Sequence, residues 1–404
     1  MRRQFPILDQ LVNGFPLAYL DSATTTQKPT TVLDRMTDFY RRDNANVHRG
    51  LSTLSMRATD EFERARTIVA SFLGASAEYQ VIFTSGTTAS LNLVARSYLA
   101  PKLSTGDNVV VSIMEHHSNF LPWQQLAKQQ GAELRVATVD QRARLDLDHL
   151  TSLIDSRTRL VALVHVSNVL GVVNPVASVI ELAHRHGVPV VIDGAQAVAH
   201  VPVDLEKLDA DFYVFSGHKV YGPTGIGVLV AKTTLLHEME PWQFGGEMVT
   251  TVEIDRSTWA DPPARFEAGT PNVVGAVGLG AALQYVQGIG VDTIKSNERA
   301  LTSQLLNRLR GLEGVTIIGP STLEDRIGIV SFTVAGSHPH DLATVADEHG
   351  VAIRAGLQCA EPLHRFLGLG ATARASLGVY SWSQDVDQLM TAIRQAQAVI
   401  GAHD

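Results

Sequence analysis

The chain has 404 residues, of which 45% are hydrophobic and 18% are charged, and its formal net charge is −8. This composition supports a large buried core and excludes an intrinsically disordered chain. No basic patch stands out, so nucleic acid is not an expected partner. At roughly 100–200 residues per domain, the length predicts two or three domains.

The N-terminal segment carries two arginines but no apolar run long enough for a signal peptide. Nowhere does the chain approach the ~20 consecutive apolar residues that span a bilayer. The single cysteine, Cys359, excludes a disulfide within the chain and fits a reducing compartment. We therefore expect a cytoplasmic protein that makes no membrane contact.

Short β-rich runs alternate with helical patterns over the first part of the chain, which predicts an α/β fold with a large, mostly parallel sheet. Several of these runs are continuously apolar, as expected for strands that are covered on both faces. The expected strands are Gln80–Thr84, Asn108–Ile113, Glu133–Val139, Leu160–His165, Pro189–Asp193, Phe212–Phe215 and Gly227–Ala231.

Polar clusters directly follow five of these strands: SGTT, MEHHSN, SN, DGAQ and SGHK, in chain order. Open α/β sheets bind ligands in the crevice beyond the carboxyl ends of their strands. The sequence therefore predicts that these five clusters meet in one cleft.

The pattern changes after Phe266. One long helical region is expected from about Val274 to Leu312, and short strands and a helix follow it. Cys359 then lies on a loop of this smaller α+β part. The predicted organisation is an N-terminal segment (1–20), a large ligand-binding domain (21–268) and a small C-terminal domain (269–404).

Lys219 lies in SGHK, just after a buried strand and before the Gly-rich YGPTGIG. A lysine at a strand end is most often solvated, but glycines allow close backbone approach, and a partly desolvated lysine forms a Schiff base. Asp193 either caps the next helix or faces a pyridinium nitrogen that it keeps protonated. Gln196, three residues on, is placed to hydrogen-bond a phenolic oxygen of such a ring.

The segment SGTT joins a strand to a helix, and its N–H groups and hydroxyls suit a phosphate, although ordinary helix capping uses the same residues. The adjacent His116 and His117 have no further metal-binding motif near them, so a histidine stacked on a ring fits better than a metal site. A lone cysteine is usually buried, but Cys359 lies among polar residues with Arg354 and Arg374 within reach, as a nucleophilic thiolate requires.

Taken together, these motifs resemble the fold-type I pyridoxal-phosphate enzymes, specifically the SufS-like (group II) cysteine desulfurases. The resemblance runs nearly end to end and rests on YLDSATTTQKP, NVHRGLSTLS, TSGTT, MEHHSNFLPW, HVSNVLG, DGAQAV, SGHKVYGPTGIGVL, RFEAGTPN, RAGLQCAEPL and RASLGVY. The pair SGHKxYGPTGIG and DGAQ is highly specific for this superfamily. The placement of Cys359 between Arg354 and Arg374 points to the desulfurase branch.

The resemblance implies a role for each matching residue. The cofactor is pyridoxal 5′-phosphate, no metal is expected, and the partners are L-cysteine, a second copy of the chain and an acceptor protein of the SufE or SufU type. Lys219 holds the cofactor, Asp193 and Gln196 contact its ring, and His116 stacks on the ring and is a candidate acid/base. The implied nucleophile is Cys359. The other implied residues are Thr87, Thr88, Ser216 and His218 for the phosphate, Thr270 for the phosphate of the partner subunit, Asn168 and Arg374 for the substrate carboxylate, and His48, Arg49 and Arg354 at the entrance.

The chain departs from this pattern beside the cysteine. Relatives usually carry two histidines there, whereas this chain has Leu357 and Gln358. The departure leaves three further lyases on the same scaffold open: a selenocysteine lyase acting on L-selenocysteine, a cysteine sulfinate desulfinase, and a specialised C–S lyase or epimerase. A non-catalytic assembly partner is another alternative, against which the intact set of expected site residues argues.

Overall fold

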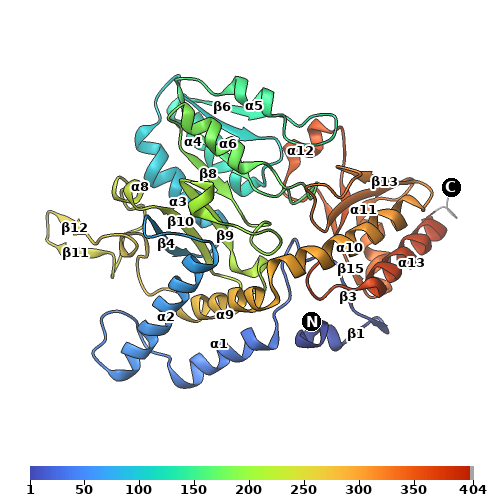
Figure 1. Cartoon of the computed structure of the whole chain (residues 1–404), viewed down its shortest axis with the longest axis horizontal. Helices are drawn as coiled ribbons and strands as arrows, with labels where there is room; N and C mark the ends of the chain where they lie inside the picture. The colour runs from blue at the N-terminus through green and yellow to red at the C-terminus, as the bar shows by residue number, and fades with distance from the viewer. Residues whose placement is uncertain (401–404) are drawn as a thin grey trace.

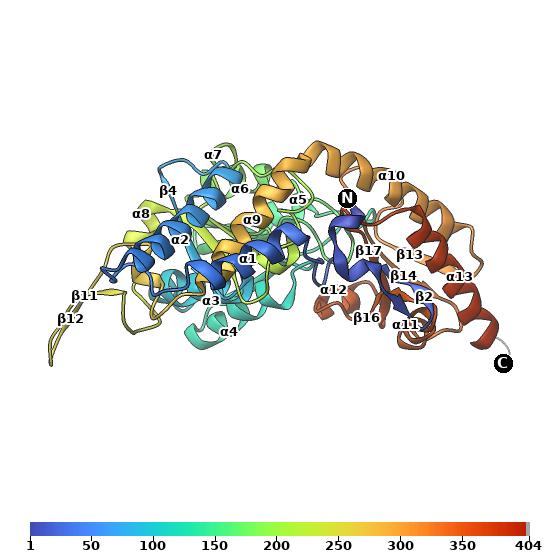
Figure 2. The ribbon, with the colours of Figure 1, turned by 90° about the horizontal axis from the view of Figure 1, so that it is seen from below.

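The computed structural model of the chain describes residues 1–400. Figure 1 shows a larger lobe built around one wide sheet and a smaller lobe that contains the C-terminal helix. Figure 2 shows the two lobes side by side along the longest axis, with the helix α10 running onto the small lobe. The predicted α/β class, with a large sheet and a smaller α+β part, is confirmed.

The large sheet has seven strands in the order β4-β10-β9-β8-β7-β5-β6. Only β10 runs antiparallel to its neighbours, β4 and β9, so the sheet is mostly parallel as predicted. The strands are β4 (Tyr79–Thr84), β5 (Asn108–Ser112), β6 (Glu133–Ala137), β7 (Thr158–Val164), β8 (Val190–Asp193), β9 (Phe212–Ser216) and β10 (Gly227–Lys232).

Alternate residues of these strands enter two separate cores, because successive side chains of a strand point to opposite faces. Val161 and Leu163 of β7 pack in one core, whereas Leu160 and Ala162 pack in the other. Helices cover both faces, which explains the continuous apolar runs in the sequence. The helices of this lobe are α1 (Thr30–Arg42), α2 (Thr53–Phe72), α3 (Thr87–Leu93), α4 (Leu121–Gln130), α5 (Leu147–Leu153), α6 (Val176–Arg185), α7 (Leu205–Leu208) and α8 (Thr233–His237).

The small lobe has an antiparallel sheet in the order β13-β14-β17-β16, with a core of its own. Its strands are β13 (Val315–Ile318), β14 (Ile329–Val334), β16 (Arg354–Gly356) and β17 (Thr372–Ser376). Its helices are α10 (Val291–Arg310), α11 (Pro339–Glu348), α12 (Glu361–Phe366) and α13 (Ser383–Ile400).

The N-terminal segment joins this lobe through β3 (Ala18–Tyr19), which pairs in parallel with β15 (Val351–Ala352). Two short hairpins complete the described chain: β1 (Leu11–Val12) with β2 (Phe15–Pro16), and β11 (Val249–Val252) with β12 (Ser257–Trp259).

The long helical region expected from about Val274 to Leu312 is present, and it contains a bend that the sequence analysis did not predict. The segment forms α9 (Val273–Ile289) and α10, which meet at an angle of 75°. Gly290 lies at the break with a φ of +85°, in the region that favours glycine. The apolar α9 packs on α1 and α2 in the large lobe. Within residues 1–400 no single helix has the length and apolarity to span a membrane, and α9 with α10 passes that test only as a bent pair.

Candidate active site

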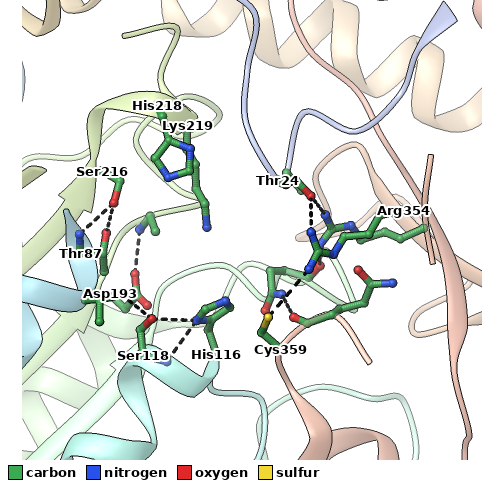
Figure 3. Close-up of a pocket in the computed structure, with 16 residues that line it drawn as sticks. Thr24, Thr87, His116, Ser118, Asp193, Ser216, His218, Lys219, Arg354 and Cys359 are labelled. Atoms are coloured by element: carbon green, nitrogen blue, oxygen red, sulfur yellow. Dashed lines mark hydrogen bonds between the residues drawn. The ribbon is translucent and has the colours of Figure 1, made fainter. Parts of the chain in front are cut away.

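A cavity of about 200 Å³ opens between the lobes, beyond the carboxyl ends of the central strands. The five polar clusters that follow the strands all contribute to its wall, as predicted, and the small lobe closes the other side. Its lining residues are Ala23, Thr24, Thr87, Thr88, His116, Ser118, Asn168, Asp193, Ala195, Ser216, His218, Lys219, Arg354, Gln358, Cys359 and Arg374. Figure 3 shows Lys219 and Cys359 on opposite sides of the same space.

Lys219 follows the end of β9 and is half-buried, and this burial lowers the pKa of its amine. The carboxylate of Asp193 opposes this effect, since a nearby negative charge favours the ammonium. The turn before the lysine requires a small residue: a Cβ on Gly217 would lie 2.8 Å from Ile226 Cγ2. The structure therefore presents a desolvated amine at a fixed position, which is what Schiff-base chemistry needs.

Asp193 ends β8 on the floor of the cavity. Burial raises the pKa of this carboxyl, and one backbone donor, Ala195 N–H, lies 2.9 Å from its Oδ1. Gly194 allows the Tyr213 ring to pack directly beneath, because a Cβ there would lie 2.2 Å from the ring. A buried carboxylate with so few partners is poised for a cationic group of a ligand.

Hydroxyl and amide groups gather at the N-terminus of α3. Thr87 N–H donates to Ser216 Oγ at 2.8 Å, and the Thr87 hydroxyl lies at the same distance from that oxygen. Thr88 Oγ1 lies 2.7 Å from Ser118 Oγ. Nearby, burial and then Lys219 lower the pKa of His218 to about 4, which keeps this ring neutral. This set of donors suits a phosphate at a helix N-terminus.

His116 lines the cavity and accepts the Ser118 N–H at its Nδ1, at a distance of 3.1 Å. Burial, followed by the charge of Lys219, lowers the pKa of this imidazole to about 3. The ring is therefore neutral at ordinary pH, and with Nδ1 acting as an acceptor it carries its proton on Nε2.

Cys359 lies in the short connection between β16 and α12. Its Sγ is 3.9 Å from Arg354 Nη2, and Arg354 Nη1 also donates to Thr24 Oγ1 at 3.3 Å. The thiol therefore lies next to a guanidinium in the wall of the cavity.

Arg374 comes from β17 and is only 2% exposed. It donates to the backbone carbonyl of Asn168 (3.0 Å), to Asp21 Oδ1 (3.1 Å) and to Thr24 Oγ1 (2.9 Å), while burial lowers its pKa. These contacts fix the guanidinium at the cavity wall. Asn168 lines the same wall, and its Oδ1 is buried with no partner.

Four predicted residues lie outside this wall. Gln196 is buried, and its amide donates to Ala23 O at 2.7 Å. Thr270 lines a separate cavity of about 290 Å³, and His48 lines another of about 240 Å³. Arg49 is paired with Glu247 at 3.0 Å. The cavity that contains Lys219 is therefore not lined by Thr270, His48 or Arg49 of the same chain.

The sequence assigned no role to Ala23, Thr24, Ser118, Ala195 or Gln358, although all five line the cavity. Thr24 lies in the run SATTT, whose hydroxyl-rich composition was the available signal. Ser118 stands two residues after His116, where only the local turn brings it back to the ring. Within residues 1–400 no group of three or more His, Cys, Asp or Glu side chains could hold a metal ion.

The chain matches a known protein family. The profile of the family "Aminotransferase class-V" matches residues 18–389. The chain belongs to this family. It is 47% identical over 401 residues to a probable cysteine desulfurase of Halalkalibacterium halodurans, a match that covers 99% of this chain and 98% of the relative. It is 48% identical over 402 residues, with the same coverage, to a cysteine desulfurase of Cronobacter sakazakii.

Solved structures agree with these relatives. The fold is similar to the crystal structure of the cysteine desulfurase CsdA (S-sulfonic acid) from Escherichia coli, with a TM-score of 0.91 and 40% identity over 99% of this chain and 98% of that one. The apo structure of the cysteine desulfurase from Thermococcus onnurineus gives a TM-score of 0.93 and 38% identity, covering 99% and 97%.

Enzymes of this family use pyridoxal 5′-phosphate, and the cavity fits that group. Its donor set supplies a half-buried amine at Lys219, a buried carboxylate at Asp193, and hydroxyl and amide donors at Thr87, Thr88 and Ser216. These groups match an aldehyde, a pyridinium nitrogen and a phosphate, respectively.

Proposed function

We propose that the protein is a cysteine desulfurase, which moves sulfur from L-cysteine to Cys359 and releases L-alanine. The observation that carries this proposal is the Cys359 thiol beside Arg354, in the same cavity as the Lys219 amine. In the overall reaction the substrate Cβ–S bond breaks and a Cβ–H bond forms. A new S–S bond joins the transferred sulfur to Cys359 as a persulfide, so the atoms and electrons balance without an external oxidant.

Lys219 is the residue that would hold pyridoxal 5′-phosphate and later take the proton from the substrate Cα. When bound, the cofactor supplies an electron-withdrawing ring that stabilises negative charge at that carbon. Burial favours the neutral amine of Lys219, which is the form able to accept a proton. Asp193 would keep the ring nitrogen protonated, and its own burial leaves it few other partners.

Arg374 and Asn168 would orient the substrate carboxylate. A guanidinium fixed by three hydrogen bonds loses little conformational entropy when it binds a carboxylate. The same contacts hold Arg374 next to Asn168, so both donors present one surface to the amino acid.

The Cys359 thiolate then attacks the substrate sulfur. Arg354 contacts the sulfur of Cys359 and holds it at the cavity before the attack. We propose that the neutral His116 ring, with its proton on Nε2, gives a proton to the departing carbon fragment or accepts one. A persulfide on Cys359 would pass to an acceptor protein of the SufE or SufU type. The lone cysteine suits a reducing compartment, and we propose the cytoplasm.

We also propose a homodimer that completes each site with residues of the partner subunit. Three of the expected site residues lie away from the Lys219 cavity of their own chain: Thr270, His48 and Arg49. The segments that carry them both contact the segment around Gly246. Arg49 pairs with Glu247, and Gly269 N–H donates to Gly246 O. Large apolar side chains are exposed on the same segments: Leu51, Met56, Trp242, Phe244, Val252 and Ile254. Exposed apolar side chains of this size support a protein–protein contact on these segments.

Phe244→Glu should weaken this dimer, because it places a charge in a desolvated contact. Val399→Glu is the matched control, since Val399 is also exposed but lies on α13 of the small lobe. Sedimentation should show monomers for the first variant only. A wild-type protein that sediments as a monomer would refute the dimer.

Cys359→Ala tests the proposed reaction. The variant should keep the cofactor absorbance and lose persulfide formation from L-cysteine, because the thiol is the sulfur acceptor rather than a cofactor ligand. Full desulfurase turnover by the variant would show that a different C–S lyase reaction takes place in this cavity.

A further inference from the structure

The Cys359 turn, residues 357–360, links β16 to α12 and contains two strained residues. Gln358 and Cys359 have φ angles of +52° and +54°, in the left-handed region that side chains other than glycine rarely adopt. Such conformations are unfavourable for these residues and persist only where surrounding contacts hold them. The contacts that hold this turn therefore decide where the thiol lies.

Gln358 makes most of these contacts, although it replaces a histidine that relatives usually carry. Only 3% of it is exposed. Its Nε2 donates to the carbonyl of Thr372 on β17 (3.2 Å) and to the carbonyl of Gly356 at the end of β16 (3.3 Å). Its own carbonyl accepts the Asn168 side-chain amide at 2.7 Å. One residue thus ties the turn to two strands of the small lobe and to a loop of the large lobe.

His117 holds the other side of the turn. Its backbone N–H donates to the Cys359 carbonyl at 2.7 Å, and its Nε2 accepts the N–H of Glu361 at 3.2 Å. The neighbouring Leu357 faces outward with 37% of its surface exposed, and its side chain makes no hydrogen bond. The polar contacts of the turn are thus concentrated on Gln358 and the backbone.

We propose that Gln358 is the positioning residue for the nucleophile: it holds the Cys359 turn strained, with the thiol beside Arg354 and facing the cavity. Asn168 contributes the contact from the large lobe: its side-chain amide donates to the Gln358 backbone carbonyl at 2.7 Å. This inference rests on the proposed desulfurase function.

Loss of the Gln358 amide should relax the turn toward unstrained φ angles and move the thiol. A misplacement of about 1 Å costs up to about 10²-fold in rate for a group that must be aligned with its target. Substrate binding and proton removal from Cα do not involve the thiol, so they should be spared. Release of selenium from L-selenocysteine, as elemental selenium with alanine as the other product, should also be spared, because this step does not need a thiol nucleophile.

Gln358→Met is the decisive variant, since methionine keeps the length and volume of the side chain and lacks the amide. Leu357→Ala is the matched control in the same turn. In Gln358→Met holoenzyme we expect hydrogen exchange at the amides of residues 358–361 to rise at least tenfold. Single-turnover persulfide formation from L-cysteine should fall ten- to a hundredfold, with an unchanged KM and unchanged L-selenocysteine turnover. Leu357→Ala should change none of these quantities.

Unchanged exchange in Gln358→Met would overturn the proposal, as would an equal loss of turnover with both amino acids, which indicates general damage to the cavity. Failure of the proposed function gives a different pattern. The wild-type protein would then form no persulfide, while the exchange measurement would still decide whether Gln358 holds the turn.

Discussion

Glu115 provides a quantitative test of the electrostatics beneath the cavity. The residue is fully buried, and burial, with a further contribution from Asp193, raises the pKa of its carboxyl from 4.5 to about 8. Three donors partly oppose this shift: Ser112 Oγ, Asn119 Nδ2 and the N–H of Val164, at 2.5, 2.5 and 3.0 Å. The structure therefore predicts a neutral carboxylic acid at pH 7, which adds no second negative charge near Asp193.

A carboxyl whose pKa is higher in the folded protein stabilises that state fully below pH 4.5, and this contribution is lost as the pH rises through about 8. Between these values unfolding releases one proton, so the free energy of unfolding falls by up to about 1.4 kcal/mol per pH unit. Over the whole window the loss reaches about 5 kcal/mol as an order of magnitude.

Glu115→Gln removes this titration. Denaturant unfolding of the wild type and the variant, measured from pH 4.5 to 9 with and without pyridoxal 5′-phosphate, should give a smaller pH slope for the variant. The quantity compared is the slope of the free energy of unfolding against pH. A pH-independent change in that free energy, caused by the glutamine amide facing Val164 N–H, does not alter the slope. Equal slopes in the two proteins would refute the neutral Glu115.

Three further predictions concern the cavity itself. Lys219→Ala should lose the Schiff-base absorbance near ~420 nm, and an unchanged band would identify a different lysine as the attachment point. Asp193→Asn should slow alanine formation at least about a hundredfold while the cofactor stays bound. Without the Asp193 carboxylate the pyridine nitrogen of the cofactor is no longer kept protonated, so the ring withdraws electrons less strongly. Unchanged single-turnover rates would contradict this role. Ser118→Ala removes the hydroxyl partner of Thr88 and His116, so titration of the apoprotein with pyridoxal 5′-phosphate should show about fivefold weaker binding, the equivalent of one hydrogen bond. An unchanged Kd would show that the hydroxyl plays no part in the phosphate cradle.

The sequence predicted the large sheet well, because its strands are apolar on both faces and polar residues stop each run at the same edge. It did not predict the bend at Gly290. Helical patterns continue on both sides of that residue, and the two helices meet there at 75° while α9 packs against α1 and α2. A glycine between two helical patterns was the available signal.

The cavity was predictable where one motif supplies the chemistry, as at Lys219 and Asp193. It was not predictable where chemistry depends on contacts between distant segments. The Gln358 carbonyl accepts a hydrogen bond from Asn168, which lies 190 positions away in the sequence. The sequence alone shows only that Gln358 replaces a histidine of the relatives. The same limit applies to Gln196, whose amide is occupied by Ala23 from the N-terminal region.

The central claim is that Cys359 receives the sulfur, and one single-turnover reaction tests it most directly. The holoenzyme is mixed with L-cysteine, and the mass of the Cys359 peptide and the released amino acid are measured together. The account predicts a gain of one sulfur (~32 Da) on that peptide, matched by one equivalent of alanine. Turnover to alanine or pyruvate with no sulfur on Cys359 would contradict it.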